Sequence, residues 1–163
     1  MNILTIGHSN HSWKTFASLL PPQGIKVLVD VRSRPVSRSA PFATRRRLPE
    51  LLRGVGARYV FMGESLGGRP SDPDCYDAIG KPDYAKIRAK PWFQEGIEEL
   101  VKLPEESRVV IMCVYGDPAR CHRSLLIGVV LEERGVEVGH LRGDGSVQGI
   151  PLQASLVFRE PDG

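Results

Sequence analysis

Apolar positions along the chain follow two alternating patterns, which predict strands and helices in turn. Five short segments are predicted to form strands, at 1–6, 27–31, 58–62, 109–112 and 136–141, and the apolar runs at 27–31 and 109–112 are typical of buried strands. Between them, apolar residues recur at helical spacing in segments 13–20, 44–53, 91–103 and 118–134. This alternation predicts an α/β protein: a single-domain, three-layer Rossmann-like fold with a mostly parallel five-stranded sheet.

Capping residues set the expected bounds of two helices. Ser12 is a suitable N-cap for the first helix. Asp117 and Pro118 are suited to begin the last helix and Gly135 to end it, which would place Cys121 in the first turn. On such a helix, His122 would point about 100° away from Cys121.

The sequence constrains the order of the strands in the sheet less than it constrains their positions along the chain. An order of 3-2-1-4-5, numbered along the chain, would place the switch point between the first and fourth strands and His8 beside Cys113. We expect one domain over 1–163, with an irregular insertion at about 69–91 that is rich in Pro, Asp and Gly. Segment 152–158 is compatible with a late strand or a short helix.

Composition narrows the class of protein. Of the 163 residues, 41% are hydrophobic and 25% are charged, as in ordinary globular proteins. No apolar run approaches the roughly 18 residues of a membrane span, and the first residues lack a signal-peptide pattern, so we expect a cytoplasmic protein without membrane contact. Three cysteines without such a signal argue against a disulfide framework, and Cys75 is expected to be an incidental thiol.

Positive charge is concentrated in one part of the chain. The formal net charge is +3, yet segment 26–58 alone holds nine basic and two acidic residues. Arginine dominates there, and its planar fork suits phosphate or carboxylate. The segment therefore indicates an anionic ligand, although a solvated helix face explains Arg45, Arg46 and Arg47 equally well.

Reactive or polar residues follow every predicted strand. They are His8 and Ser9, Asp30 and Arg32, Glu64 with Gly67 and Gly68, Cys113 to Asp117, and His140. Because the carboxyl ends of parallel strands share one edge of a sheet, these five segments should converge on a ligand site.

The first functional hypothesis is an enzyme acting on a nucleotide or nucleic acid, with glycosidic-bond or phosphate chemistry. The candidate catalytic residues are His8, Asp30, Glu64, Cys113, Cys121 and His140. The candidate substrate-binding residues are Ser9, Arg32, Arg34, Ser37, Gly67, Gly68, Tyr115, His122 and Arg123. Arg45, Arg46 and Arg47 would extend the site as a nucleic-acid contact. The argument for one shared site requires Asp30, Arg32, Cys113 and Arg123 to line one cleft.

Three alternatives remain open. Arg120, Arg123 and a helix N-terminus could activate Cys121 as a thiolate. Val29-Asp-Val-Arg32 and the late Cys…Arg-Ser segment look like the two signatures of rhodanese-type sulfurtransferases. However, the stretch from Cys113 to Arg120 is longer than a rhodanese loop and contains Pro118, and the stretch from Cys121 to Ser124 is too short. A non-catalytic nucleic-acid-binding module needs no pocket. Metal ligands could come from His8, Cys113, Cys121, His122 and His140, but no C-x-x-C or H-x-x-x-H pair exists, so no metal or other cofactor is assigned.

Several of these segments together resemble the family called domain of unknown function 488. The resemblance rests on Thr5-Ile-Gly-His-Ser9, Val29-Asp-Val-Arg32 with Pro35 and Ser37, Leu66-Gly-Gly68, Cys113, Asp117-Pro118 and Cys121-His-Arg123. It implies a compact α/β domain and specifies no activity. The family pattern usually has a glutamate two residues after the first cysteine, where this chain has Tyr115. If that glutamate is a general base, this protein lacks it or uses Glu64 instead.

Overall fold

The computed structural model describes residues 2–105 and 107–149. Its centre is one sheet in the order β3-β2-β4-β1-β5-β6. The strands are β1 (Asn2–Gly7), β2 (Val27–Asp30), β3 (Arg58–Phe61), β4 (Val109–Cys113), β5 (Glu137–Leu141) and β6 (Val147–Gly149). All pairings are parallel except that of β6 with β5. The predicted mostly parallel α/β fold is confirmed, with six strands rather than five.

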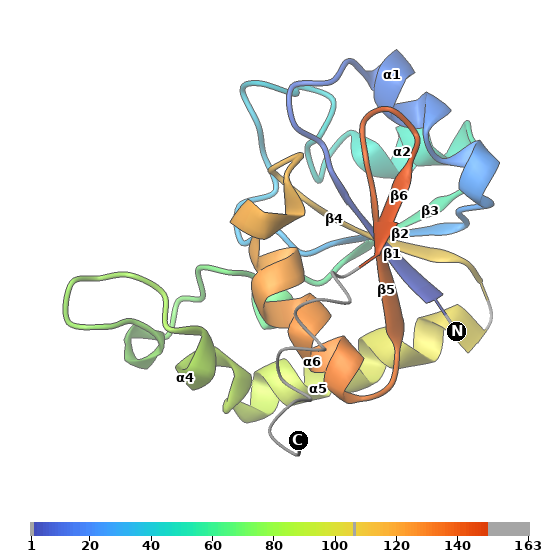
Figure 1. The fold of residues 1–163 in the computed structure, drawn as a ribbon. Coiled ribbons are helices and arrows are strands. Elements are labelled where there is room, and N and C mark those ends of the chain that lie inside the picture. Colours follow the sequence, from blue (N-terminus) through green and yellow to red (C-terminus); the bar gives the residue numbers. More distant parts are fainter. Residues whose placement is uncertain (1, 106, 150–163) are drawn as a thin grey trace.

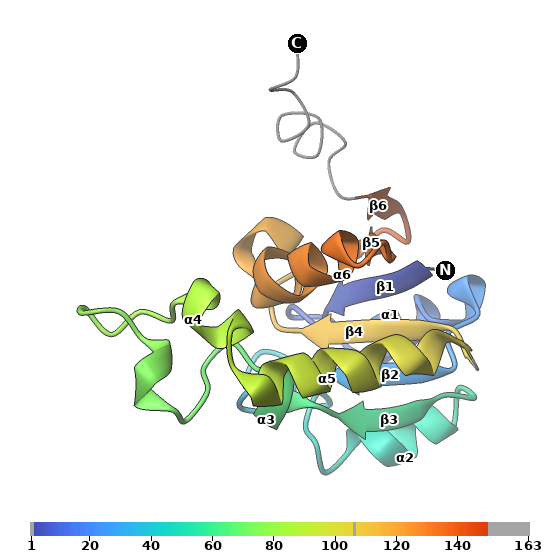
Figure 2. The same cartoon turned by 90° about the horizontal axis from the view of Figure 1, so that it is seen from below.

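Helices cover both faces of the sheet and give the three layers (Figures 1 and 2). On one face lie α1 (Trp13–Ser18) and α2 (Leu48–Arg53); on the other lie α3 (Gly63–Leu66), α5 (Pro91–Lys102) and α6 (Val129–Glu133). α4 (Tyr84–Arg88) belongs to an arm, residues 69–90, that extends beyond the carboxyl ends of the strands. The arm falls within the Pro-, Asp- and Gly-rich segment at about 69–91.

The alternation of side chains along each strand divides the hydrophobic core in two. In β4, Val109 and Ile111 pack with α5 and α6, where Phe93 and Ile97 are fully buried. The intervening Val110 and Met112 pack toward α1 and α2. A strand with apolar residues at every position thus fills both cores, which explains why the continuous apolar runs marked the buried strands.

The predicted strand order is wrong because the first and fourth strands are exchanged. β4 lies beside β2 and β1 lies beside β5, whereas the expected order placed β1 beside β2 and β4 beside β5. The predicted adjacency of the first and fourth strands is confirmed, because β1 pairs with β4 and the His8 N–H donates to the Cys113 carbonyl at 3.0 Å. β4 and β2 are both fully buried apolar strands, so hydrophobicity alone did not distinguish their possible neighbours.

The sixth strand comes from a hairpin after β5. The Arg142 N–H donates to Ser146, and Gly145 between them has a φ of 87°, which glycine adopts readily. The Asp144-Gly145 dipeptide is a recognised hairpin signal. Segment 152–158 lies outside the described residues.

The helix expected at 44–53 begins later, at Leu48. Pro49 falls in its first turn, the one part of a helix that tolerates a residue without an N–H. Arg45, Arg46 and Arg47 therefore lie in the turns before α2, not on a helix face. In contrast, the predicted Ser12 cap of α1 is confirmed, since its hydroxyl accepts the Thr15 N–H.

The last predicted helix is interrupted. Asp117 caps a single 3₁₀ turn, Pro118–Arg120, after which Cys121 is extended, with φ −131° and ψ 142°. A π-helical segment, Arg123–Gly128, then leads into α6, and Gly135 follows the helix end with a positive φ. Cys121 is therefore not in the first turn of a helix that Asp117 caps. Instead its carbonyl accepts the N–H groups of Ser124 and Leu125 at the start of the second helical segment.

Across the described ranges, 2–105 and 107–149, none of the helices combines the length and apolar character needed to cross a membrane.

Candidate functional site

A cleft of about 800 Å³, here called the main cleft, opens at the carboxyl edge of the sheet. The loops after β2 and β4 form one side of it, and the arm contributes Lys81 and Tyr84 from the other. Its basic lining residues are Arg32, Arg34, Arg69, Lys81 and Arg120, and its acidic ones are Asp77 and Asp83. The Asp77 carboxylate accepts hydrogen bonds from backbone N–H groups of its own turn. The Asp83 carboxylate accepts them from N–H groups at the α4 N-terminus. The cleft therefore has a net positive lining.

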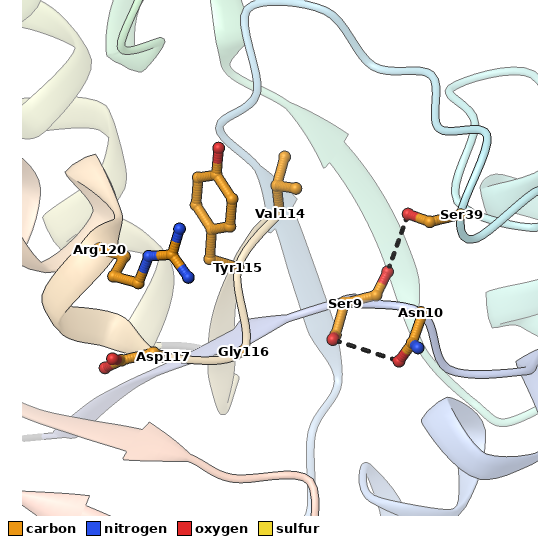
Figure 3. A pocket seen from close by; sticks show the side chains of 8 residues that line it. All are labelled: Ser9, Asn10, Ser39, Val114, Tyr115, Gly116, Asp117 and Arg120. Atoms are coloured by element: carbon orange, nitrogen blue, oxygen red, sulfur yellow. Dashed lines mark hydrogen bonds between the residues drawn. The ribbon is translucent and has the colours of Figure 1, made fainter.

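A side pocket of about 290 Å³ adjoins the main cleft across Tyr115. Figure 3 shows Tyr115 beside Arg120, with Ser9, Asn10 and Ser39 on the opposite wall. The Arg120 guanidinium lies 5.3 Å from the centre of the Tyr115 ring, which is half exposed. Val114, Tyr115 and Arg120 line both spaces, so a ligand in the main cleft could contact the side pocket as well.

Two buried cysteines and a buried histidine meet in the lining of the main cleft. Cys113 ends β4, whereas Cys121 and His122 lie at the break between the two helical segments. His122 Nδ1 is 3.5 Å from Cys113 Sγ and 3.9 Å from Cys121 Sγ. His122 thus lies against Cys121, contrary to the expectation from a continuous helix, because the extended backbone at Cys121 changes the direction of the side chains.

The orientation of His122 is fixed by two contacts. Its Nε2–H donates to the Val31 carbonyl at 2.9 Å, so Nδ1 is the ring nitrogen that faces the two sulfur atoms. Gly68 packs against the ring: a Cβ at that position would lie 2.8 Å from His122 Cγ. Gly67 is similarly close to Ser33. Gly67 also lies close to the Gly63 carbonyl, so the close approach of both glycines is to other parts of the protein.

The two cysteines differ in their electrostatic environment. The hydrogen bond from Cys113, the neighbouring His122 and the charge of Arg123 lower the pKa of Cys121 below its ordinary value, although burial opposes them. The same hydrogen bond, together with burial, raises the pKa of Cys113. Of the two, Cys121 is the sulfur that carries negative charge more readily.

Asp30 and Arg32 form a buried ion pair. Both Asp30 oxygens accept from the Arg32 guanidinium, at 2.9 and 2.8 Å, and Tyr59 donates a further hydrogen bond at 2.6 Å. Arg32 also donates to the Ala43 carbonyl. Burial and the bond to Asp30 raise the pKa of Tyr59. Asp30 is fully buried behind Arg32, so the carboxylate does not line the cleft.

Arg123 is completely buried and holds the loop after β4. It donates to the carbonyls of Tyr115 and Gly116 and, through Nε, to the Thr5 hydroxyl. Thr5 in turn contacts His140 Nδ1 at 2.5 Å. Burial and the charges of Arg123 and Arg142 lower the pKa of His140 to about 4. Neither Arg123 nor His140 lines the main cleft.

The requirement that Asp30, Arg32, Cys113 and Arg123 share one cleft is thus not met. Of these four, only Arg32 and Cys113 line it. Seven of the sequence-selected residues line the main cleft: Arg32, Arg34, Gly68, Cys113, Tyr115, Cys121 and His122. Ser9 lines the side pocket. The strand ends do share one edge of the sheet, but several of their side chains turn inward.

The remaining candidates lie elsewhere. His8 is fully buried; its Nδ1–H donates to the Ser9 carbonyl, and burial lowers its pKa. Glu64 is exposed on α3, outside both spaces. The Ser37 hydroxyl accepts the Ala40 N–H within its own loop. Arg45, Arg46 and Arg47 are exposed, and Arg45 lies over the Phe61 ring at 4.1 Å.

The sequence did not single out the contribution of the arm. Arg69, Lys81 and Tyr84 line the main cleft from this irregular segment, and burial raises the pKa of Tyr84. Arg69 and Lys81 in an insertion after the third strand were the sequence signal for an anion-binding contribution. Because the insertion lacks hydrophobic periodicity, the sequence did not predict where these side chains lie in the fold.

These features define a three-layer α/β protein with a basic cleft at the carboxyl edge of its sheet and a Cys–Cys–His cluster within that cleft. The chain belongs to the family described as domain of unknown function DUF488, whose model matches residues 12–130. No curated protein and no solved structure matches it.

The family resemblance left open whether Glu64 replaces the glutamate missing at position 115. In the structure Glu64 is exposed on α3 and does not line the main cleft. Tyr115 is instead half exposed between the two spaces, where its ring can contact a ligand.

Proposed function

We propose that this protein is an enzyme acting on a phosphate-bearing molecule of nucleotide size, either free or within a nucleic acid. One observation carries the proposal: Arg34, Arg69, Lys81 and Arg120 line a cleft of about 800 Å³ without forming an ion pair in the part of the chain that the structure describes. Basic side chains grouped in a concave site attract an anion.

The size and the lining of the cleft favour a nucleotide over a small inorganic anion. Its volume is in the range of about 300–1,000 Å³ in which drug-sized ligands bind. Arginine offers two-pronged contacts to phosphate, and the half-exposed Tyr115 offers a face on which a base can stack.

A basic surface continues from the cleft along the loop before α2. Between residues 31 and 49 there is no acidic residue, and Arg34, Arg38, Arg45, Arg46 and Arg47 are all exposed. Arg34 belongs to both the cleft and this surface. Such continuity suits a longer polyanion whose reacting nucleotide occupies the cleft.

The groups able to react lie in the Cys–Cys–His cluster. The carboxylates first assigned to acid and base catalysis, Asp30 and Glu64, do not line the cleft. Rhodanese-type sulfur transfer finds less support, because such chemistry needs free backbone N–H groups around the anion. Here the N–H groups of Ala119, Arg120 and Cys121 already donate within their own turn.

Calorimetric titration would test the proposal with a nucleoside monophosphate, the corresponding nucleoside and a short oligonucleotide. We expect the phosphate-bearing ligands to bind and the nucleoside to bind at least about 10-fold more weakly, since one charged hydrogen bond contributes about 1.5–3 kcal/mol. Arg34→Gln and Arg120→Gln should each weaken phosphate binding by a similar factor. Arg58→Gln, at the opposite edge of the sheet, is the matched control and should change nothing.

Mass spectrometry of the incubated ligands then separates an enzyme from a binding module. A changed nucleotide or oligonucleotide supports the proposal. Oligonucleotide binding with a steep salt dependence and no product would identify a non-catalytic module. Equal affinity for nucleoside and nucleotide would overturn the proposal. So would a thiosulfate-dependent persulfide on Cys121 without nucleotide binding, which would establish sulfur transfer instead.

A further inference from the structure

Cys113, Cys121 and His122 have the geometry of an incomplete tetrahedron. Their ligand atoms, two Sγ and one Nδ1, all lie within 4.8 Å of one another. The two sulfur–nitrogen distances are 3.5 and 3.9 Å. In a tetrahedral zinc site, bonds of about 2.3 Å to sulfur and about 2.0 Å to nitrogen place neighbouring ligand atoms about 3.5–3.8 Å apart. The cluster is thus close to the spacing that an ion requires.

His122 is prepared as a ligand. Its Nε2–H is held by the Val31 carbonyl, so Nδ1 is the ring nitrogen that faces the two sulfur atoms. Histidines that bind metals usually donate their other ring N–H to a carbonyl or carboxylate in this way, which fixes the tautomer and the ring. The close packing of Gly68 against the ring restricts it further.

Burial adds to the case. All three residues are at least nine-tenths buried, yet all three line the main cleft. Within residues 2–105 and 107–149, none of these three groups belongs to a salt bridge, and the positive charge of Arg123 lies near Cys121. A cation would interact favourably with both sulfur atoms, and binding would release a thiol proton.

We propose that Cys113, Cys121 and His122 bind one zinc ion and leave its fourth position open to the main cleft. Two sulfurs and one imidazole nitrogen favour zinc over hard cations such as magnesium or calcium. Throughout residues 2–105 and 107–149, no fourth Cys, His, Asp or Glu joins this cluster. Three protein ligands with one open position is the pattern of catalytic rather than structural zinc sites.

The site does not depend on the identity of the substrate. If the cleft binds phosphate as proposed above, the open position would face that ligand, and the ion could activate a water or polarise the substrate. If the phosphate proposal fails, the metal site stands on its own geometry, and the experiment below reads metal binding alone.

The test is a titration of the full-length chain, reduced and freed of metal by dialysis against a chelator. Cobalt(II) reports thiolate ligands through a charge-transfer absorption, and zinc(II) should then displace it with one ion per chain. Cys113→Ser and Cys121→Ser should each lose more affinity than the roughly 10–100-fold that follows loss of a supporting partner. Cys75→Ala is the matched control, because Cys75 is buried outside the cluster.

X-ray absorption spectroscopy of the zinc-loaded wild-type protein identifies the ligand atoms directly. It therefore tests the proposal even if a serine variant does not fold. We expect two sulfurs at about 2.3 Å, one nitrogen at about 2.0 Å and one further light atom. Fewer than two sulfurs, absence of one-to-one binding, or zinc affinity unchanged in both serine variants would overturn the proposal.

Discussion

The position of the His122 ring requires that residue 68 has no side chain. A Cβ on Gly68 would lie 2.8 Å from Cγ and 3.0 Å from Nδ1 of His122, whose opposite side is bonded to Val31. Neither the backbone nor the ring has room to move freely. The glycine therefore fixes the position of the imidazole in the cluster.

Gly68→Ala should lower the free energy of unfolding by about 1–3 kcal/mol, the usual cost of overpacking. Chemical denaturation would measure it. Gly149→Ala, where no atom of the described residues lies within 4 Å of the new methyl group, is the control and should change stability by less than about 0.5 kcal/mol. Equal stability of the two variants would contradict the tight packing at Gly68.

Arg123 is the largest fully buried side chain in the described residues, and each part of its guanidinium donates a hydrogen bond. Arg123→Met should reduce the free energy of unfolding by about 2–4 kcal/mol, because the Tyr115 and Gly116 carbonyls lose their charged donor. Arg134→Met removes a partly exposed ion pair with Glu98 and should cost less than about 1 kcal/mol. A smaller loss for Arg123→Met than for Arg134→Met would show that Arg123 does not anchor the loop.

At the scale of elements, the Asp30–Arg32 pair joins parts of the fold that are distant in sequence. Asp30 ends β2, Tyr59 belongs to β3, and Ala43 lies in the basic loop before α2. The pair therefore positions the loop that carries Arg34 and the exposed arginines. Its function is to hold the wall of the cleft in place.

Asp30→Asn should destabilise the protein by about 3–5 kcal/mol, since it leaves the Arg32 cation buried without its counter-charge. Tyr59→Phe removes one hydrogen bond from the same carboxylate and should cost only about 1–2 kcal/mol. Urea denaturation of both variants provides the comparison. If Asp30→Asn were no more harmful than Tyr59→Phe, the ion pair would contribute little to the fold.

A second feature at the scale of elements is the break between two helical segments at Cys121. A continuous helix from Pro118 would separate Cys121 from His122 on its surface, whereas the extended Cys121 brings both toward Cys113. The π-helical segment that follows is a form often found at functional sites. Local irregularity thus creates the cluster.

For the whole molecule, the buried histidines link stability to pH. The pKa of His140 is lowered from 6.5 to about 4, chiefly by burial, and that of His8 is lowered as well. The folded state thus keeps these rings neutral, while the unfolded chain binds protons below about pH 6.5. Stability is therefore complete above that pH and decreases as the pH falls toward 4.

Denaturation curves at several pH values between 7 and 4.5 would measure this dependence, with a slope of up to about 1.4 kcal/mol per pH unit for each histidine. His140→Asn should flatten the slope and leave the contribution of His8. An unchanged slope in this variant would mean that His140 is not held neutral.

Much of the fold followed from local pattern. A run of consecutive apolar residues predicted the buried strand β4. Ser12 indicated where α1 begins, and Gly135 indicated where α6 ends. The sixth strand was overlooked although Asp144-Gly145 signalled its hairpin. Pro49 likewise indicated the late start of α2. These two features were accessible from the sequence.

The site was accessible only in part. The sequence correctly brought Arg32, Arg34, Cys113 and Tyr115 to one edge, because parallel strands end together. It could not tell that Asp30 and Arg123 turn inward, since the groups they bond, Tyr59 and Thr5, are remote along the chain. Nor could it place the arm over the cleft.

By itself, the sequence determined the class of fold, the two-sided core and the edge where polar residues gather, because hydrophobic periodicity and strand direction are local properties. The tertiary structure alone decided the order β2-β4-β1, the inward ion pairs and the meeting of Cys113 with Cys121 and His122. These features depend on contacts between segments far apart in the chain. The number of residues between two positions does not tell how close the two are in the folded protein.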